Sequence, residues 1–222
     1  MGAHESMEHA EHAEHAAHSA HGGNSNNKKI ALIISVLALM LAFSETFGKS
    51  AQTAALNDQI EASNLWNFFQ AKNIRRTVTI VATEMAKIDA TGATTDTQKA
   101  ALAKQIDEWT KTSARYRSEP EAGNGKGEGT VELARRALEK EKERDLQLNK
   151  YHNFEFASAA FQIGIVLASA AVITSMMGLA YLAIGVGFLG AALTGTGLFM
   201  PELLHNILHW FQALFASGGA HH

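Results

Sequence analysis

The sequence predicts an all-α integral membrane protein with about three transmembrane helices, a long helical extramembrane stalk or bundle, and a C-terminal amphipathic helix. Residues 156–200 contain no Asp, Glu, Lys, Arg or His over 45 positions. A spanning helix needs about 20 mostly apolar residues, so this run can hold two spans and a turn. Only two prolines interrupt 222 residues rich in helix-forming side chains. No segment alternates apolar and polar residues long enough to indicate a strand.

The amino-acid composition excludes several classes of function. The net charge of −3 is too close to neutral to suggest a nucleic-acid partner. The chain has no cysteine, which excludes disulfides, thiolate metal ligands and cysteine nucleophiles. The glycine-rich stretch 123–129 follows no strand and carries an acidic residue, so we do not expect it to bind phosphate. These observations favour a non-enzymatic protein.

The first span is predicted at 28–47, after a His-rich low-complexity tail at 1–27. Lys28 and Lys29 precede 15 uncharged residues, and Glu45 follows them. Lysines that extend their side chains to one interface let so short a run cross the bilayer. A cleaved signal peptide is the competing interpretation. It is disfavoured because the sequence SETFGKS lacks a small-x-small cleavage pattern.

The region 48–155 is predicted to be helical and extramembrane. An apolar series with 4-3 spacing indicates the seam of a packed helix: Ile74, Val78, Val81, Met85 and Ile88. A second series follows a capping box formed by Thr95 and Gln98: Leu102, Ile106, Trp109, Ser113 and Tyr116. After a loop at 118–129, Thr130 is expected to cap a third helix. The charged middle of that helix, 139–145, is expected to be solvated on all sides.

The second and third spans are predicted at 156–176 and 179–199. Both carry small residues at four-residue spacing, which lets helix backbones approach closely in lipid. These residues are Ala160, Gly164, Ala168, Ala183, Gly187, Ala191 and Gly195. They are expected to pack within this hairpin or against helices of another protomer. Residues 201–216 then place apolar and polar side chains on opposite sides, which predicts an amphipathic helix at the membrane interface.

Two groups of residues could bind a metal. Histidines recur every third residue in the N-terminal tail: His9, His12, His15, His18 and His21. Imidazoles bind Zn, Cu or Ni, so weak affinity for these ions is one interpretation of the tail, and a solvated linker is the other. Glu202, His205 and His209 lie on one helical face, where they form either part of a metal site or the polar face of an interfacial helix.

Glu45 has two interpretations of its own. Carboxylates inside a membrane often mark ion or proton paths. At the edge of the span and close to Lys49, Glu45 is better interpreted as an interfacial residue. Tyr151, His152 and Glu155 approach the membrane from the other direction and are predicted neighbours at a similar depth.

Several segments resemble a known family. These are EHAEHAEHAAH, LAFSETFGKSAQTAAL, IEASNLWNFFQAKNIR, ARYRSEPE, YHNFEFASAAFQ and IVLASAAVIT. Over about residues 5–200 the chain resembles the bacterial domain-of-unknown-function family 4337, particularly its alphaproteobacterial branch. The resemblance implies a small bacterial membrane protein with one span, a helical region and a final hairpin. It brings no catalytic, cofactor-binding or metal-binding residues.

The sequence therefore favours a self-associating structural or scaffolding protein of the bacterial inner membrane. The expected partners are the lipid bilayer, further copies in a homo-oligomer and other membrane proteins. The surface formed by Leu65, Trp66, Phe68 and Phe69 covers more than one helical face, which also favours association. Metal handling or transport through the His tail is the alternative. Lys28 and Lys29 favour a cytoplasmic N-terminus, which would place the helical region in the periplasm.

Overall fold

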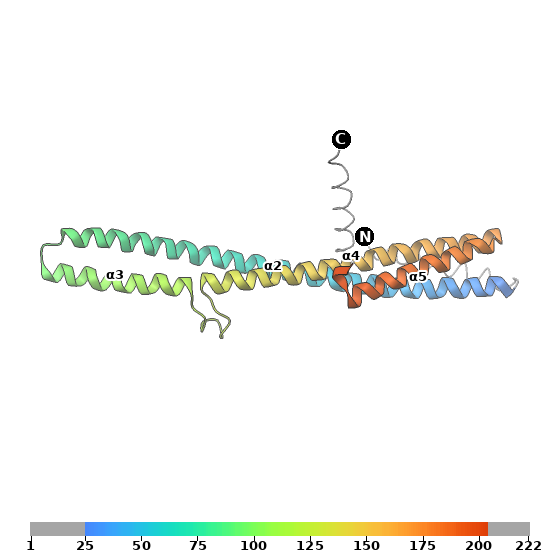
Figure 1. The fold of residues 1–222 in the computed structure, drawn as a ribbon, viewed down its shortest axis with the longest axis horizontal. Coiled ribbons are helices and arrows are strands. Elements are labelled where there is room, and N and C mark those ends of the chain that lie inside the picture. Colours follow the sequence, from blue (N-terminus) through green and yellow to red (C-terminus); the bar gives the residue numbers. More distant parts are fainter. Residues whose placement is uncertain (1–24, 204–222) are drawn as a thin grey trace, which may run out of the picture. The chain divides into compact units, whose positions relative to one another are not determined.

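The computed structural model describes residues 25–203, and this part of the chain is all-α, as predicted. Its helices are α2 (Ser25–Gly92), α3 (Asp96–Arg117), α4 (Thr130–Thr174) and α5 (Met177–Phe199) (Figure 1). The His-rich tail through residue 24 and residues 204–222 lie outside the described residues. The predicted amphipathic helix is therefore seen only at residues 201–203, which are helical.

The chain divides into two compact units, with α2 and α4 each contributing to both. The first unit takes residues up to 55 and from 145 onward, and the second takes 56–144. In the first unit, α2, α4 and α5 share an apolar core. Its buried members are Ile30, Ile34, Leu37, Leu41, Ala157, Phe161, Ile165, Ala168, Ala171, Ala180 and Ala183.

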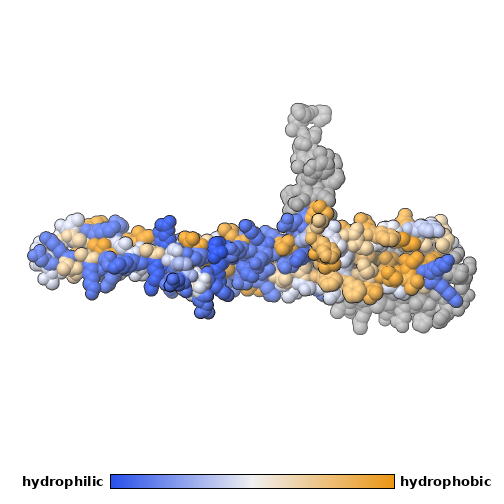
Figure 2. Space-filling view, turned by 60° about the horizontal axis from the view of Figure 1, so that its bottom comes forward, coloured by the Kyte–Doolittle hydropathy of each residue, from blue (hydrophilic) through white to orange (hydrophobic). Residues whose placement is uncertain are grey.

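Three described helices are long and apolar enough to cross a membrane: α2 from Asn27 onward, α4 and α5. The fraction buried within the most apolar stretch is 44% in α4, against 28% in both α2 and α5. Most of that surface is therefore left uncovered by the protein itself. Hydrophobic residues accordingly dominate this unit in the face shown in Figure 2.

One side of α2 faces inward along its whole length. Buried or partly buried residues follow each other at 4-3 spacing from Ile30 to Ala90. A repeat of 3.5 residues keeps one side of a helix facing its packing partners, as in a coiled coil. This inward line comprises Ile30, Ile34, Leu37, Leu41, Ser44, Gly48, Ala51, Ala55, Asp58, Ala62, Leu65, Phe69, Lys72, Arg76, Thr79, Thr83, Ala86 and Ala90.

Small residues bring the helices of the first unit close together. The Leu37 side chain fills the space beside Gly164 and Gly187. A Cβ atom built at Gly187 would lie only 2.6 Å from Leu37 Cδ2. The Phe161 ring lies against Gly190 in the same way, 2.8 Å from a built Cβ. Most of the predicted small residues therefore pack against other helices of the same chain. Five of them are buried: Ala160, Gly164, Ala168, Ala183 and Gly187.

In the second unit, no described helix of the same chain packs on the predicted seam of α2. Its five apolar side chains are between 53% and 70% exposed. The opposite side of the helix is buried instead, with Thr83 and Ala86 each 5% exposed. Side chains this small permit close approach of a neighbouring helix, and α3 runs beside this part of α2 in Figure 1. The predicted face of α3, from Leu102 to Tyr116, is half-buried at all five positions.

A small apolar cluster joins α2 to α4 within the same unit. Leu65 packs with Leu133 and Ala137, and Trp66 and Phe69 cover them. Of the four residues expected to form an association surface, Leu65, Trp66 and Phe69 pack against α4 instead, and only Phe68 remains exposed, at 39%. The charged segment 139–145 is also not solvated on all sides, since Trp66 Nε1 donates to the Glu141 carboxylate at 2.9 Å.

The glycine contacts generate a prediction for α5. Gly190→Ala should destabilise the first unit by about 1–3 kcal/mol, because the new methyl group overlaps the buried Phe161 ring. Gly185→Ala is the matched control, since no heavy atom lies within 4 Å of its built Cβ. Both changes gain the same helix propensity. Thermal unfolding in detergent measures the difference, and equal melting temperatures for the two variants would contradict the packing.

Candidate functional site

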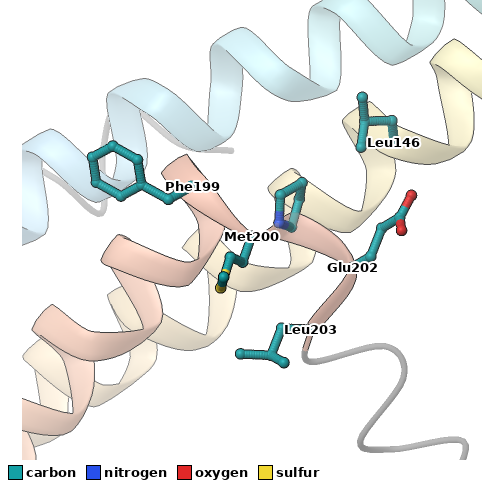
Figure 3. Close-up of a pocket in the computed structure, with 6 residues that line it drawn as sticks. Leu146, Phe199, Met200, Glu202 and Leu203 are labelled. Carbon is teal, nitrogen blue, oxygen red and sulfur yellow. The ribbon is translucent and has the colours of Figure 1, made fainter.

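Of the predicted metal ligands, the structure describes only Glu202. His9, His12, His15, His18, His21, His205 and His209 lie outside the described residues. Glu202 is exposed and is the one charged residue lining an open pocket of about 370 Å³ (Figure 3). The other lining residues are Leu146, Phe199, Met200, Pro201 and Leu203. Within residues 25–203, no three His, Asp or Glu side chains are placed to hold a metal ion together.

Polar side chains in the first unit connect helices through backbone carbonyls. The buried Ser44 hydroxyl donates to the Phe154 carbonyl at 2.9 Å. Asn153, which is 1% exposed, donates from Nδ2 to the Pro201 carbonyl at 3.1 Å, so it ties α4 to the chain just after α5. An amide buried without such an acceptor would be costly. These two contacts were not predicted from the sequence, because their partners lie 110 and 48 positions away along the chain.

Glu45 is half-buried, and the predicted neighbours have contacts of their own. His152 Nδ1 lies 3.5 Å from Glu155 Oε2 on the same helix, and both side chains are more than half exposed. Tyr151 stacks at a tilt beside His152, with ring centroids 5.5 Å apart. This group lies at the surface of α4.

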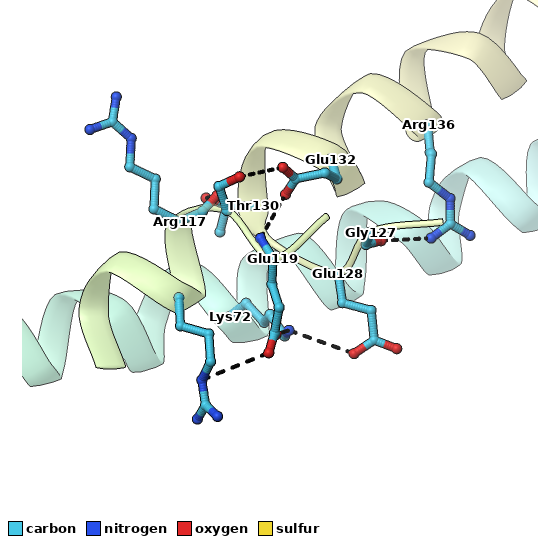
Figure 4. A network of polar contacts seen from close by, with 10 residues as sticks. Lys72, Arg117, Glu119, Gly127, Glu128, Thr130, Glu132 and Arg136 are labelled. Carbon is cyan, nitrogen blue, oxygen red and sulfur yellow. Dashed lines mark hydrogen bonds and ion pairs between the residues drawn. The ribbon is translucent and has the colours of Figure 1, made fainter. Parts of the chain in front are cut away.

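The most connected polar site lies in the second unit, around the loop 118–129 (Figure 4). Lys72 is at its centre, with a side chain only 8% exposed. Its ammonium lies 3.3 Å from Glu119 and 3.7 Å from Glu128, so one lysine of α2 binds both arms of the loop. Arg115 adds a longer contact of 3.8 Å to Glu119. An ammonium this buried requires such partners to offset its loss of hydration.

Glu132 fastens the other side of the loop. The Ser118 hydroxyl donates to its carboxylate at 2.5 Å, and the Glu119 backbone N–H donates at 3.3 Å. The Ser118 hydrogen bond in particular lowers the pKa of Glu132 below the ordinary 4.5, because it stabilises the charged form. Thr130 does not act as the predicted cap: its hydroxyl donates to the Arg117 carbonyl at 3.2 Å.

The loop's backbone conformation also depends on this arrangement. Gly127 has a φ of +77°, which residues with a Cβ rarely adopt, and its carbonyl accepts from Arg136 Nη1 at 3.2 Å. A side chain at Gly127 would also collide with Glu132. The capping pair at the start of α3 is confirmed in one half, because Thr95 Oγ1 accepts from the Gln98 N–H at 3.3 Å.

Lys140 makes the second group of ion pairs. Its ammonium lies 2.7 Å from Glu143, 3.2 Å from Glu61 and 3.3 Å from Asp58. Hydrogen bonds to Glu143, then Glu61 and Asp58, raise the pKa of Lys140 above its ordinary value. Among the described residues, every buried side-chain nitrogen or oxygen has a hydrogen-bond partner. These polar groups thus pair with one another, and their contacts hold α2, the loop 118–129 and α4 in register.

The described chain thus defines a class: an all-α protein with three helices long and apolar enough to cross a membrane. The model of the family "Domain of unknown function (DUF4337)" matches residues 26–200. The chain belongs to this family, which confirms the resemblance seen in its sequence. No curated protein and no solved structure matches the chain.

The environment of Glu132 predicts a pH dependence. Its folded pKa lies below the unfolded value, so its contribution to stability is complete above the unfolded pKa and is lost as the pH falls through the folded pKa. Glu132→Gln should therefore lower the stability of the second unit at pH 7, and the difference from the parent protein should shrink as the pH falls below 4.5 and vanish below the folded pKa. Glu121→Gln, in the exposed part of the same loop, is the control. Thermal unfolding at several pH values measures both, and a deficit that persists at low pH would contradict the assignment.

Proposed function

We propose that the protein is a non-enzymatic structural or scaffolding component of a membrane that associates with further copies of itself. The observation that carries this proposal is an outward apolar side on helices whose inward side is already packed. Both units have such an outward apolar side, and we expect a different partner to cover it in each unit.

In the first unit, the expected partner is lipid. On α2 the outward residues follow each other at 4-3-4 spacing and are at least half exposed: Leu32, Val36, Leu39 and Phe43. Val166 of α4 and Phe188 of α5 are 64% and 73% exposed. Exposing such side chains to water costs about 1.5–3 kcal/mol each relative to burial. A bilayer removes this cost, and helices satisfy their own backbone hydrogen bonds there.

In the second unit, self-association is supported by the exposed apolar residues of α2. The surface around Leu65 no longer supports it, because α4 covers that cluster. The small residues of α4 and α5 support it less than expected, since most of them pack within the chain. The series from Ile74 to Ile88 remains open, and it is flanked by charged residues typical of a segment in water.

The proposed location is the bacterial inner membrane, with a cytoplasmic N-terminus and a periplasmic helical region. Lys28 and Lys29 support this orientation, because lysines close to a span favour the cytoplasmic side. The proposed partners are the lipid bilayer, other copies of this chain and other membrane proteins.

Self-association predicts an oligomer in mild detergent. The mass of the full-length protein, measured by light scattering with correction for bound detergent, should be a multiple of 23.9 kDa at micromolar concentrations. Dilution should shift it toward the monomer. A protein that stays monomeric at every concentration, both in detergent and in lipid nanodiscs, would contradict the proposal.

Metal handling or transport is the alternative proposal, and the period-three histidines of the tail support it. It predicts that the full-length protein binds Zn, Cu or Ni tightly and selectively in calorimetry. Deleting residues 4–21 should abolish that binding. Weak binding without selectivity would leave the tail as a linker, because imidazoles without fixed geometry bind many divalent metals.

A further inference from the structure

We propose that Ile74, Val78, Val81, Met85 and Ile88 form the seam of a parallel coiled coil between copies of this chain. These five residues are called the outer stripe below. The inference rests on the proposed self-association and specifies its surface. Nothing else in the described second unit exposes so continuous a series of large apolar residues at one helical spacing.

The outer stripe has the geometry of a coiled-coil seam. Its 4-3-4-3 spacing averages 3.5 residues, the repeat that keeps one side of a helix against a partner helix over successive turns. Val78 and Met85 take the a positions of this heptad, and Ile74, Val81 and Ile88 take the d positions. The inward line of α2 falls on the b and f positions, on the opposite side. The contacts of α2 with α3 and α4 therefore leave the seam free.

The residues preceding the stripe favour an identical partner. The same heptad places Asn64 at an a position and Asn67 at a d position, and both are exposed. Buried against an unrelated apolar helix, these amides would lose their hydrogen bonds to water. Against a second copy in register, each asparagine faces its own counterpart and can both donate and accept. Asparagine at a seam position is a known means of fixing register and oligomer state.

The direction and number of helices follow from the same positions. Copies inserted in one bilayer with one orientation bring equivalent segments together in parallel. The three d positions are all β-branched, a pattern that disfavours parallel dimers and shifts the preference to trimers or tetramers. Glu84 at a g position would meet Asp89 at an e position of a parallel neighbour. This repulsion is reduced because Lys87 donates to Glu84 at 2.7 Å.

Single cysteines test the seam directly, since the chain has none of its own. Ile74→Cys, Val81→Cys and Ile88→Cys are each made in the full-length protein and oxidised in membranes. In a parallel seam each cysteine meets its counterpart at a distance that a disulfide can bridge, so all three should give a covalent dimer on gels. Asn73→Cys, exposed on the same helix at a c position, is the control and should give at least tenfold less dimer.

The outcomes separate this inference from the proposed function. Val81→Asp should reduce the oligomer measured in mild detergent to monomer, whereas Asn73→Asp should not. An oligomer that survives Val81→Asp, with no disulfide at the three seam positions, would overturn the seam and leave self-association standing. Crosslinking of Val81→Cys without that of Ile74→Cys and Ile88→Cys would indicate antiparallel helices and also overturn it. A monomer throughout, with no disulfide, would contradict both proposals.

Discussion

Close packing of helices through small residues is the constraint on which the described structure depends. Within the first unit, Leu37 occupies the space left by Gly164 and Gly187, and Phe161 occupies that left by Gly190. Within the second unit, the small residues Thr83 and Ala86 are buried on the inward side of α2, where large apolar residues would otherwise be expected. Because helices in lipid gain little from the hydrophobic effect between one another, such close contact is a main source of their association.

The same packing leaves the other side of α2 outside. In the first unit Ile30, Ile34, Leu37 and Leu41 take the inward side, so Leu32, Val36, Leu39 and Phe43 face the surroundings. In the second unit Thr83 and Ala86 take the inward side, and the outer stripe faces outward. In the proposed arrangement lipid covers the first group and other copies cover the second. The buried polar residues fit the same scheme, since Ser44, Asn153 and Lys72 each bind a partner within their own unit.

The fold class was predictable because the distribution of charged residues and the helical spacing of apolar residues both indicate it. The uncharged run, the scarcity of proline and the Thr95 capping pair all indicated helices that the structure contains. The packed side of α2 was missed because a hydrophobic pattern marks the largest apolar residues, whereas the real contact uses Lys72, Thr83 and Ala86. Continuing the 4-3 spacing from Leu37 and Leu41 would have found it. The loop network around Lys72 was not predictable, because its partners Glu119 and Glu128 lie 47 or more positions away in sequence.

The central claim is that the outward apolar side of the first unit faces lipid. Nitroxide labels on single cysteines in liposomes test it, through their collisions with oxygen and with a water-soluble nickel chelate. Labels replacing Val36 and Phe188 should collide often with oxygen and rarely with the chelate, and a label at the buried Ile34 should collide rarely with either. A label at Asn124, in the exposed loop, should be open to the chelate. Chelate collisions at Val36 and Phe188 as frequent as at Asn124 would contradict the account.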